Sequence, residues 1–308
     1  MKKITLLLAC LLTNLAMARS ETDVSETPVN VQKFALENID IIEIRYTSES
    51  VTLLRSNTDS LVVKEYMNSD DTIHHAQITH SDNTLIVEPG RRGLFDRRLR
   101  PRVEVYIPAS DKTFRIQTTS GTIENINGIT VGAITMHSSS GAIHADNLTA
   151  NNVGFEAMSG RIEASRITAD GVGFRTTSGA IQGENLTGNV SARTNNGRVV
   201  LNGIGGHLSV ETTSGAVQHT VAKEAGNVSI STTSGAIVLH VPKELRFSFT
   251  SKTTSGRLAT PFAEQLFVSV DDMGAAHGFI GGCPSETQCS REMNVETTSG
   301  PITVGWVD

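Results

Sequence analysis

The chain has 308 residues, of which 5% are aromatic and 27 are glycine, and its formal charge is −6 at neutral pH. That length allows two ordinary domains or one long repeat array, and a core with so few rings must be filled by aliphatic residues and threonine. The acidic balance, which reaches −8 once Lys2 and Lys3 are removed, argues against nucleic acid as the main partner.

The first 18 residues predict a secretory signal peptide. Lys2 and Lys3 provide the charged start, residues 4–12 form a short apolar run, and Ala16-Met17-Ala18 is an A-x-A site for cleavage after Ala18. A second interpretation is a lipoprotein anchored at Cys10, because residues 7–10 resemble a lipobox. No later stretch reaches about 20 apolar residues. We therefore expect an exported protein of the periplasm or cell surface, with no transmembrane segment in the mature chain.

Residues 19–27 are polar and are expected to be disordered, whereas residues 28–115 alternate apolar and polar positions and predict irregular N-terminal coils that form a cap. The densest charge cluster lies in that region. Arg forms bidentate contacts with carboxylates and phosphates, so this loop is a candidate binding site for anionic envelope polymers; the alternative is a solvated surface loop. The cluster consists of Arg91, Arg92, Arg97, Arg98, Arg100 and Arg102.

Residues 116–308 repeat with a period of about 19 residues. The pair Ser-Gly recurs eight times, and Asn196-Gly197 fills the one vacant place. Successive glycine spacings are 20, 19, 19, 18, 18, 20, 21 and 44 residues, and the last one predicts a degenerate coil or an insertion. The glycines expected to turn the chain are Gly121, Gly141, Gly160, Gly179, Gly197, Gly215, Gly235, Gly256 and Gly300.

Positions around each of these glycines keep their character. Two residues after the glycine all nine side chains are aliphatic, seven before it all nine are apolar, and four before it all nine are polar. This alternation has the period of two of a strand with one buried face. No helical period fits, and parallel stacking places like residues on like. We predict an all-β, single-chain parallel β-solenoid. The repeat does not fix its handedness, and the expected right-handed winding rests on general chirality and on the family resemblance given below.

Two structural roles are expected at the turn. Glycine takes positive φ without a Cβ penalty, and Asn196 is the residue that tolerates such geometry best among the alternatives. Three residues before the glycine stands Thr or Ser in every coil except that of Ala157. Stacked in the interior, these hydroxyls are expected to form a hydrogen-bonded ladder.

Outward-facing Glu156, Arg175, Arg193 and Glu211 are predicted to stack on successive coils about 5 Å apart. Lyases and hydrolases built on β-helices place carboxylates in such strips, so a polysaccharide lyase or hydrolase is the enzymatic alternative. The two arginines separate the carboxylates, and no Asp joins them as a paired acid and base. We therefore prefer a surface ion-pair ladder.

Cys283 and Cys289 remain as an even pair after signal removal, and in an oxidising compartment they predict a small disulfide loop. They lie in an expected insertion at about residues 262–293. The histidines show no metal-ligand spacing, and no nucleotide loop or catalytic elbow occurs. We expect no metal and no cofactor.

The segment Val103–Pro108, followed by residues 114–121 and the later Thr-Thr-Ser-Gly copies, resembles a bacterial β-strand-repeat family. Its members are named as adhesins, have no known function and are related to the head domains of autotransporter-type adhesins. The resemblance covers residues 35–308 and implies a parallel β-helix at the cell envelope. It carries over no catalytic residue.

These observations favour a non-enzymatic, adhesin-like structural or binding protein. Its expected partner is an envelope polysaccharide, a host glycan or another protein. A third interpretation is a periplasmic scaffold in an envelope-stress or assembly system, because exposed sheet edges can add strands from another chain.

Overall fold

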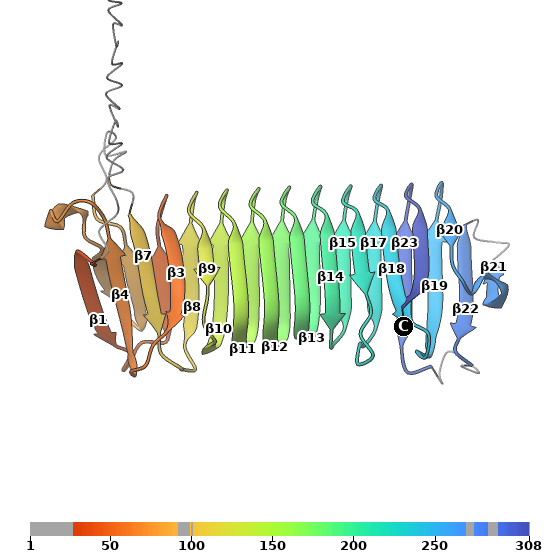
Figure 1. Cartoon of the computed structure of the whole chain (residues 1–308), viewed down its shortest axis with the longest axis horizontal. Helices are drawn as coiled ribbons and strands as arrows, with labels where there is room; N and C mark the ends of the chain where they lie inside the picture. Colours follow the sequence, from red (N-terminus) through yellow and green to blue (C-terminus); the bar gives the residue numbers. More distant parts are fainter. Residues whose placement is uncertain (1–26, 92–98, 100, 269–273, 283–288, 308) are drawn as a thin grey trace, which may run out of the picture.

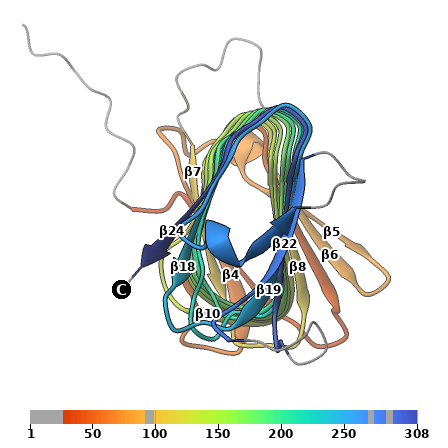
Figure 2. The same cartoon turned by 90° about the vertical axis from the view of Figure 1, so that its right-hand side faces the viewer.

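The computed structural model describes residues 27–91, 99, 101–268, 274–282 and 289–307. They form a long stack of strands wound around an oval core, with β1 (Asn30–Ala35) at one end and β21 (Leu266–Val268) at the other (Figures 1 and 2). The other regular elements within these ranges are further strands and two short 3-10 turns, η1 (Thr72–His74) and η2 (Ala263–Gln265). The predicted all-β, mainly parallel, solenoid-like architecture is confirmed, and its handedness stays a prediction. Within the same ranges we find no helix able to span a membrane.

One long side of the stack, called here the pre-turn face, consists of segments that end at a Ser-Gly or Asn-Gly turn. Parallel pairing aligns Ile134, Val153, Val172, Val190, Leu208 and Val228, which are 18 to 20 positions apart in the sequence. Like residues therefore stack on like, as predicted. The central members are β8 (Thr113–Thr118), the second halves of β10 (Ile129–Ser138), β11 (Ile143–Ala157), β12 (Ile162–Thr176) and β13 (Ile181–Thr194), then β15 (Leu208–Thr212) and β17 (Val228–Thr232).

The opposite side, the post-turn face, is built from segments that follow the turn. Its central members are β9 (Ile123–Asn125), the first segments of β11, β12 and β13, and then β14 (Val199–Ile204), β16 (Val217–Thr220) and β18 (Ile237–Pro242). Each of β11, β12 and β13 continues around a corner into the pre-turn face. Left-handed backbone at Asn147, Arg166, Asn185 and Gly203 makes this corner.

Inward-pointing side chains of both faces form one continuous core. The aliphatic residues two positions after the turn glycines, such as Ile143, Ile162 and Ile181, are almost completely buried. Phe155 and Phe174 stack inside the pre-turn face with ring centroids 5.2 Å apart. Each such side chain contributes about 1.5–3 kcal/mol on burial, but a single coil exposes its flanks, so stability depends on the neighbouring coils.

The turn glycines are required for a reason other than the one expected. None of the nine has positive φ, so the conformational argument is wrong. A Cβ on Gly141, Gly160 or Gly179 would instead lie 1.9 Å from the carbonyl oxygen of the turn residue one coil earlier. The glycine column exists because successive turns pack backbone against backbone, and a Cβ does not fit between them.

The interior hydroxyl column also differs from the prediction, because its hydroxyls bond to the backbone and not to one another. Thr176 Oγ1 accepts a hydrogen bond from Gly179 N at 3.0 Å, and Thr194 Oγ1 does the same for Gly197 N at 3.0 Å. Thr176 Oγ1 also donates to the carbonyl of Met158 in the preceding coil at 3.4 Å. The threonine hydroxyls of the column thus satisfy turn amides, which would otherwise be costly, whereas the Ser138 hydroxyl donates to the Gly121 carbonyl at 3.3 Å.

At the N-terminal end, the strands follow a different order in space than in the chain. The first coil, residues 41–55, is inserted between residues 84–107 and residues 113–125. Its strands pair in parallel with the strands on both sides. On the pre-turn face β2 (Ile41–Arg45) lies between β6 (Thr84–Glu88) and β8, and on the post-turn face β3 (Ser50–Arg55) lies between β7 (Arg102–Ile107) and β9. Antiparallel β1, β4 (Ser60–Tyr66) and β5 (Gln77–Ser81) extend the two faces beyond it.

The C-terminal end has the same kind of insertion. The last coil, residues 292–307, fills a place between residues 228–242 and residues 247–259 (Figure 1). Gly300 packs on the carbonyl of Gly235, and Gly256 packs on that of Gly300. The strands involved are β23 (Glu292–Thr297) between β17 and β19 (Phe247–Thr253), and β24 (Ile302–Val307) between β18 and β20 (Leu258–Ala259).

The spacing of 44 residues between Gly256 and Gly300 therefore does not mark a degenerate coil stacked in sequence order. After β20 the chain leaves the stack through η2 and β21, and it forms β22 (Ala275–Ile280), which pairs antiparallel with both β19 and β21. It then returns to occupy the vacant place one coil back. The last two coils are thus stacked in reverse order.

Candidate functional site

A groove of about 880 Å³ runs along the pre-turn face, across the strands. Its floor is the outward-facing position six residues before the turn glycine, which carries small residues over six consecutive coils. Because these side chains are short and those on either side are longer, the surface is hollowed. The floor residues are Thr135, Gly154, Gly173, Ser191, Ser209 and Ser229.

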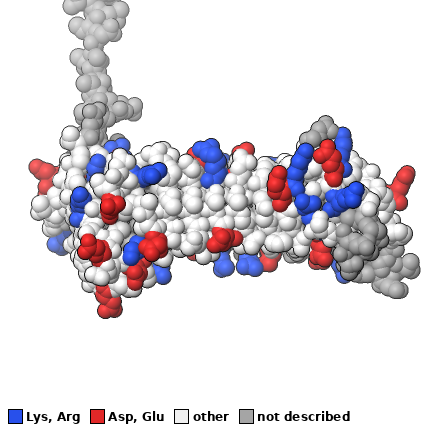
Figure 3. Space-filling view, turned by 90° about the horizontal axis from the view of Figure 1, so that it is seen from below, with Lys and Arg blue, Asp and Glu red and all other residues white. Residues whose placement is uncertain are grey.

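The groove crosses seven strands, from β10 to β23. With a spacing of about 4.8 Å between strands, it is about 29 Å long. Seen from below, the middle of the stack shows few charged side chains, whereas Lys, Arg, Asp and Glu gather toward the two ends (Figure 3). On the pre-turn face, the floor of the groove carries only Thr, Gly and Ser over six coils, so the groove is long, open and uncharged along this floor.

The rim nearer the corner, called here the amide rim, consists of Asn152, Asn189, His207 and Asn227, with a gap at Gly171 between Asn152 and Asn189. Side chains on this rim accept hydrogen bonds from backbone amides of the next coil. Asn189 Oδ1 accepts from His207 N at 3.2 Å, and His207 Nδ1 accepts from Asn227 N at 2.9 Å. Asn227 Oδ1 accepts from Glu292 N at 3.1 Å. These three side chains are thus held in fixed orientations by the stack itself.

The opposite rim, called here the charged rim, contains Glu156, Arg175, Arg193 and Glu211 on successive coils, as the sequence predicted. Arg193 forms a two-point contact with Glu211, with nitrogen–oxygen distances of 2.8 and 3.2 Å. The hydrogen bond from Arg193 holds the pKa of the Glu211 carboxyl below its usual value. Glu156 lies 3.5 Å from His137. Among the described residues, Arg175 has no carboxylate within ion-pair distance.

Two smaller hollows border Arg175. One, of about 140 Å³, is lined by Gly154, Gly173 and Ser191 and by three residues of the charged rim, Glu156, Arg175 and Arg193. The other, of about 460 Å³, lies on the turn side between Arg175, Arg193 and Asn195. Arg175 is exposed and lines both of these hollows, and the smaller one shares Gly154, Gly173 and Ser191 with the main groove.

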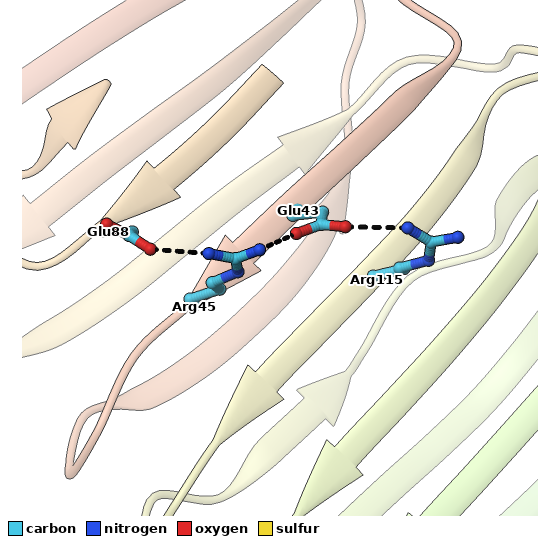
Figure 4. Close-up of polar contacts among 4 residues, drawn as sticks. All are labelled: Glu43, Arg45, Glu88 and Arg115. Atoms are coloured by element: carbon cyan, nitrogen blue, oxygen red, sulfur yellow. Dashed lines mark hydrogen bonds and ion pairs between the residues drawn. The ribbon is translucent and has the colours of Figure 1, made fainter. Parts of the chain in front are cut away.

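A chain of ion pairs lies on the pre-turn face at the N-terminal side of the groove (Figure 4). Arg45 bonds to Glu88 at 2.8 Å and to Glu43, and Glu43 accepts from Arg115 at 2.8 Å. The hydrogen bond from Arg115, with Arg45 in support, lowers the pKa of the nearly buried Glu43 carboxyl. These residues come from β6, β2 and β8, so the chain of charges joins the inserted first coil to both of its neighbours.

The post-turn face has a hollow of about 420 Å³ of a different character. Two of its four carboxylates are paired locally: Glu163 bonds to His144 at 2.9 Å and to Arg161 at 2.8 Å, and Asp146 pairs with Arg166. The hydrogen bond from Arg161 lowers the pKa of Glu163. No group of side chains suited to hold a metal ion occurs in the part of the chain that the structure describes.

The predicted arginine loop falls largely outside the described residues, which exclude Arg92, Arg97, Arg98 and Arg100. Arg102, at the start of β7, lies over the Tyr66 ring at 4.2 Å and 3.7 Å from Glu104. Arg91 donates its backbone amide to Ile73 O at 2.8 Å. A binding role for this loop stays a prediction. The disulfide also stays a prediction, because Cys283 lies outside the described residues.

The floor of the groove and the amide rim were missed at the level of the sequence. Their signal is present in the repeat alignment: the column six residues before the glycine carries Thr, Gly or Ser over six coils, and the column eight before it carries Asn or His in four of these coils and Ala133 or Gly171 in the other two. Such residues are common on solvated strands and in turns. The floor column forms a groove only because mostly longer side chains flank it on both sides in the folded stack.

The sequence pattern that defines Toastrack DUF4097 matches residues 39–305. Because this match spans well over half of the chain, the protein belongs to the Toastrack DUF4097 family, which confirms the resemblance to a β-strand-repeat family. No curated protein matches the chain.

Several solved structures are similar to it. A "putative adhesin" from Bacteroides fragilis NCTC 9343 is 11% identical over 89% of this chain and 96% of its own, with a TM-score of 0.43. One from Parabacteroides merdae ATCC 43184 is 10% identical over 91% and 96%, also with 0.43. A "putative cell adhesion protein" from Clostridium sporogenes ATCC 15579 is 9% identical over 90% and 98%, with 0.26.

Proposed function

We propose that this Toastrack protein is a non-enzymatic, adhesin-like module that holds an extended polysaccharide of the cell envelope or of a host surface. The observation that carries the proposal is the groove of the pre-turn face. It runs across seven strands without interruption, so its occupant must itself be extended along the stack.

The chemistry of the groove supports a sugar polymer. Its floor offers small side chains and backbone against which a sugar ring can lie, and its rims offer amide, imidazole, guanidinium and carboxylate groups. These groups match the hydroxyl and ring oxygens that a polysaccharide presents along its whole length. A short ligand would fill only a fraction of the groove, so binding strength is expected to grow with chain length.

The lyase or hydrolase alternative has weaker support. Glu156 and Glu211 are the carboxylates of the charged rim, and they are three coils apart, at about 14 Å. Paired glycosidase carboxylates lie about 5–9.5 Å apart. Arg193 also neutralises Glu211 directly. The rim is better suited to holding a polymer than to cleaving one.

Export is part of the proposal. A signal peptide cleaved after Ala18, with a lipoprotein anchored at Cys10 as the alternative, would bring the groove to the periplasm or the cell surface. The arginine loop is proposed as a second contact with anionic envelope polymers. The periplasmic scaffold remains the second candidate function, because the edge strand β21 exposes Phe267, which is 72% accessible, where a protein partner could add a strand.

The test is binding of the chain from residue 19 to immobilised envelope and host polysaccharides, by biolayer interferometry. Gly173→Leu fills the groove, and its Cβ meets no atom closer than 3.9 Å, so the fold accepts it. Gln182→Leu, on the post-turn face, is the matched control. We expect at least about tenfold weaker binding for Gly173→Leu alone. Equal binding by both variants, or shortened polymer in the supernatant, would contradict the proposal.

A further inference from the structure

The amide rim is biased toward hydrogen-bond donors. Asn189 Oδ1, His207 Nδ1 and Asn227 Oδ1 each accept a backbone amide of the next coil. An Asn whose oxygen is used in this way keeps two N–H donors, and a neutral imidazole that accepts at Nδ1 carries its proton on Nε2. The three side chains line the groove, so what they offer a ligand is a row of donors on consecutive coils.

The charged rim adds one uncompensated cation on the opposite side. Arg193 is neutralised by Glu211 at 2.8 Å, whereas Arg175, its neighbour in register, has no ion-pair partner among the described residues. Arg175 borders the small hollow formed with Gly154, Gly173 and Ser191, which Glu156 and Arg193 also line, so this hollow holds two cations and one carboxylate. A carboxylate lying in that hollow would gain a charge-assisted contact with the guanidinium.

We propose that the groove selects an acidic polysaccharide with sparse carboxylates. One carboxylate binds Arg175, and the oxygens of the neighbouring sugars accept hydrogen bonds from Asn189, His207 and Asn227. This inference rests on the proposed function and specifies its ligand class. A single unpaired Arg between Glu156 and the neutralised Arg193 fits one acid group per few sugars, and it disfavours a dense polyanion such as nucleic acid, which requires several unpaired cations.

A peptide is a poorer match for the donor row. An extended peptide backbone presents as many N–H donors as carbonyl acceptors, so half of its polar groups would face donors without a partner. An acidic polysaccharide carries ether and carboxylate oxygens that accept only, and its hydroxyls can rotate to accept as well. The ligand class therefore follows from the direction in which the rim hydrogen bonds run.

The test measures binding of the chain from residue 19 to hyaluronate, xanthan and gellan, three polymers with sparse carboxylates, and to the methyl ester of each. We expect at least one acid form to bind saturably and its ester to bind at least about tenfold more weakly. Two variants address the two rims. Arg175→Gln removes the cation, and Asn189→Asp keeps the acceptor for His207 N but replaces the free donors by an oxygen.

Both variants are expected to weaken binding of the acid polymer at least about tenfold. Matched controls with the same charge changes on the post-turn face, Arg198→Gln and Gln182→Glu, are expected to bind like the parent chain. Equal affinity for acid and ester, with Gly173→Leu still blocking binding, would overturn the acidic ligand class and leave the proposed function standing. No binding of any polymer, or binding unaffected by Gly173→Leu, would overturn both.

Discussion

Replacing a turn glycine in the middle of the stack should test why these glycines are needed. In Gly160→Ala the new Cβ would lie 1.9 Å from the Gly141 carbonyl oxygen and 2.8 Å from its carbon. Real Cβ contacts essentially never fall below 3.0 Å, so the two turns would have to separate by at least 1.1 Å. That oxygen belongs to the backbone of a neighbouring coil, and no side-chain rotation relieves the contact.

The expected cost is large because both neighbouring coils are packed in the same way. Inserting one methylene into a packed core costs about 1–3 kcal/mol, and a backbone clash shared between coils should lie at or above the upper end. The matched control is Gly154→Ala in the same coil, whose Cβ would be 3.4 Å from Thr135 Oγ1, an ordinary contact. We expect its stability to remain within about 0.5 kcal/mol of the parent chain.

Urea unfolding followed by circular dichroism measures both variants. A third variant, Gly160→Asn, separates the two possible causes. If positive φ were the requirement, Asn would be tolerated better than Ala. With close backbone approach as the cause, Asn is at least as damaging as Ala. Parent-like stability of Gly160→Ala, or clear recovery in Gly160→Asn, would refute the packing argument.

Three further predictions concern the interior and the two ends of the stack. Burial lowers the pKa of His219 from 6.5 to about 4. The free energy of unfolding should therefore be highest above pH 6.5 and fall by up to about 3 kcal/mol between pH 6.5 and 4. Urea unfolding at each pH measures this decline, which should be absent in His219→Leu. A pair of cysteines at Thr303 and Val238, or at Thr303 and Ala259, should form a disulfide, because the two positions of each pair are adjacent in register. Peptide mass mapping detects these disulfides. Cysteines at Val238 and Ala259 should not form one, and a disulfide between them would contradict the inserted final coil. Glu43→Gln should lower the free energy of unfolding by about 1–2 kcal/mol at neutral pH. It should lower it little below the lowered pKa of the Glu43 carboxyl, because the parent glutamate is itself protonated there. An equal loss of stability at both pH values would exclude the ion pairs as its cause.

The sequence by itself determined the architecture of the regular coils. Alternation of apolar and polar positions around each glycine assigns every side chain to the core or to solvent, and a constant spacing forces like residues into columns. Val153, Val172 and Val190 are therefore paired as predicted, and so are Glu156, Arg175 and Arg193. These features depend on local periodicity, which a sequence records directly.

Other features were decided by the tertiary structure. The insertion of residues 41–55 and 292–307 between coils that are distant in the chain depends on which parallel edges remain open, and no periodicity encodes this. The role of Gly160 depends on how closely two turns approach, and the partners of Thr176 depend on a carbonyl one coil away. The groove exists because short floor residues such as Gly154 and Ser191 stack between columns of mostly longer side chains. The depth of the groove is a property of the assembled surface, because it arises from the difference in side-chain length between neighbouring columns and not from any residue alone.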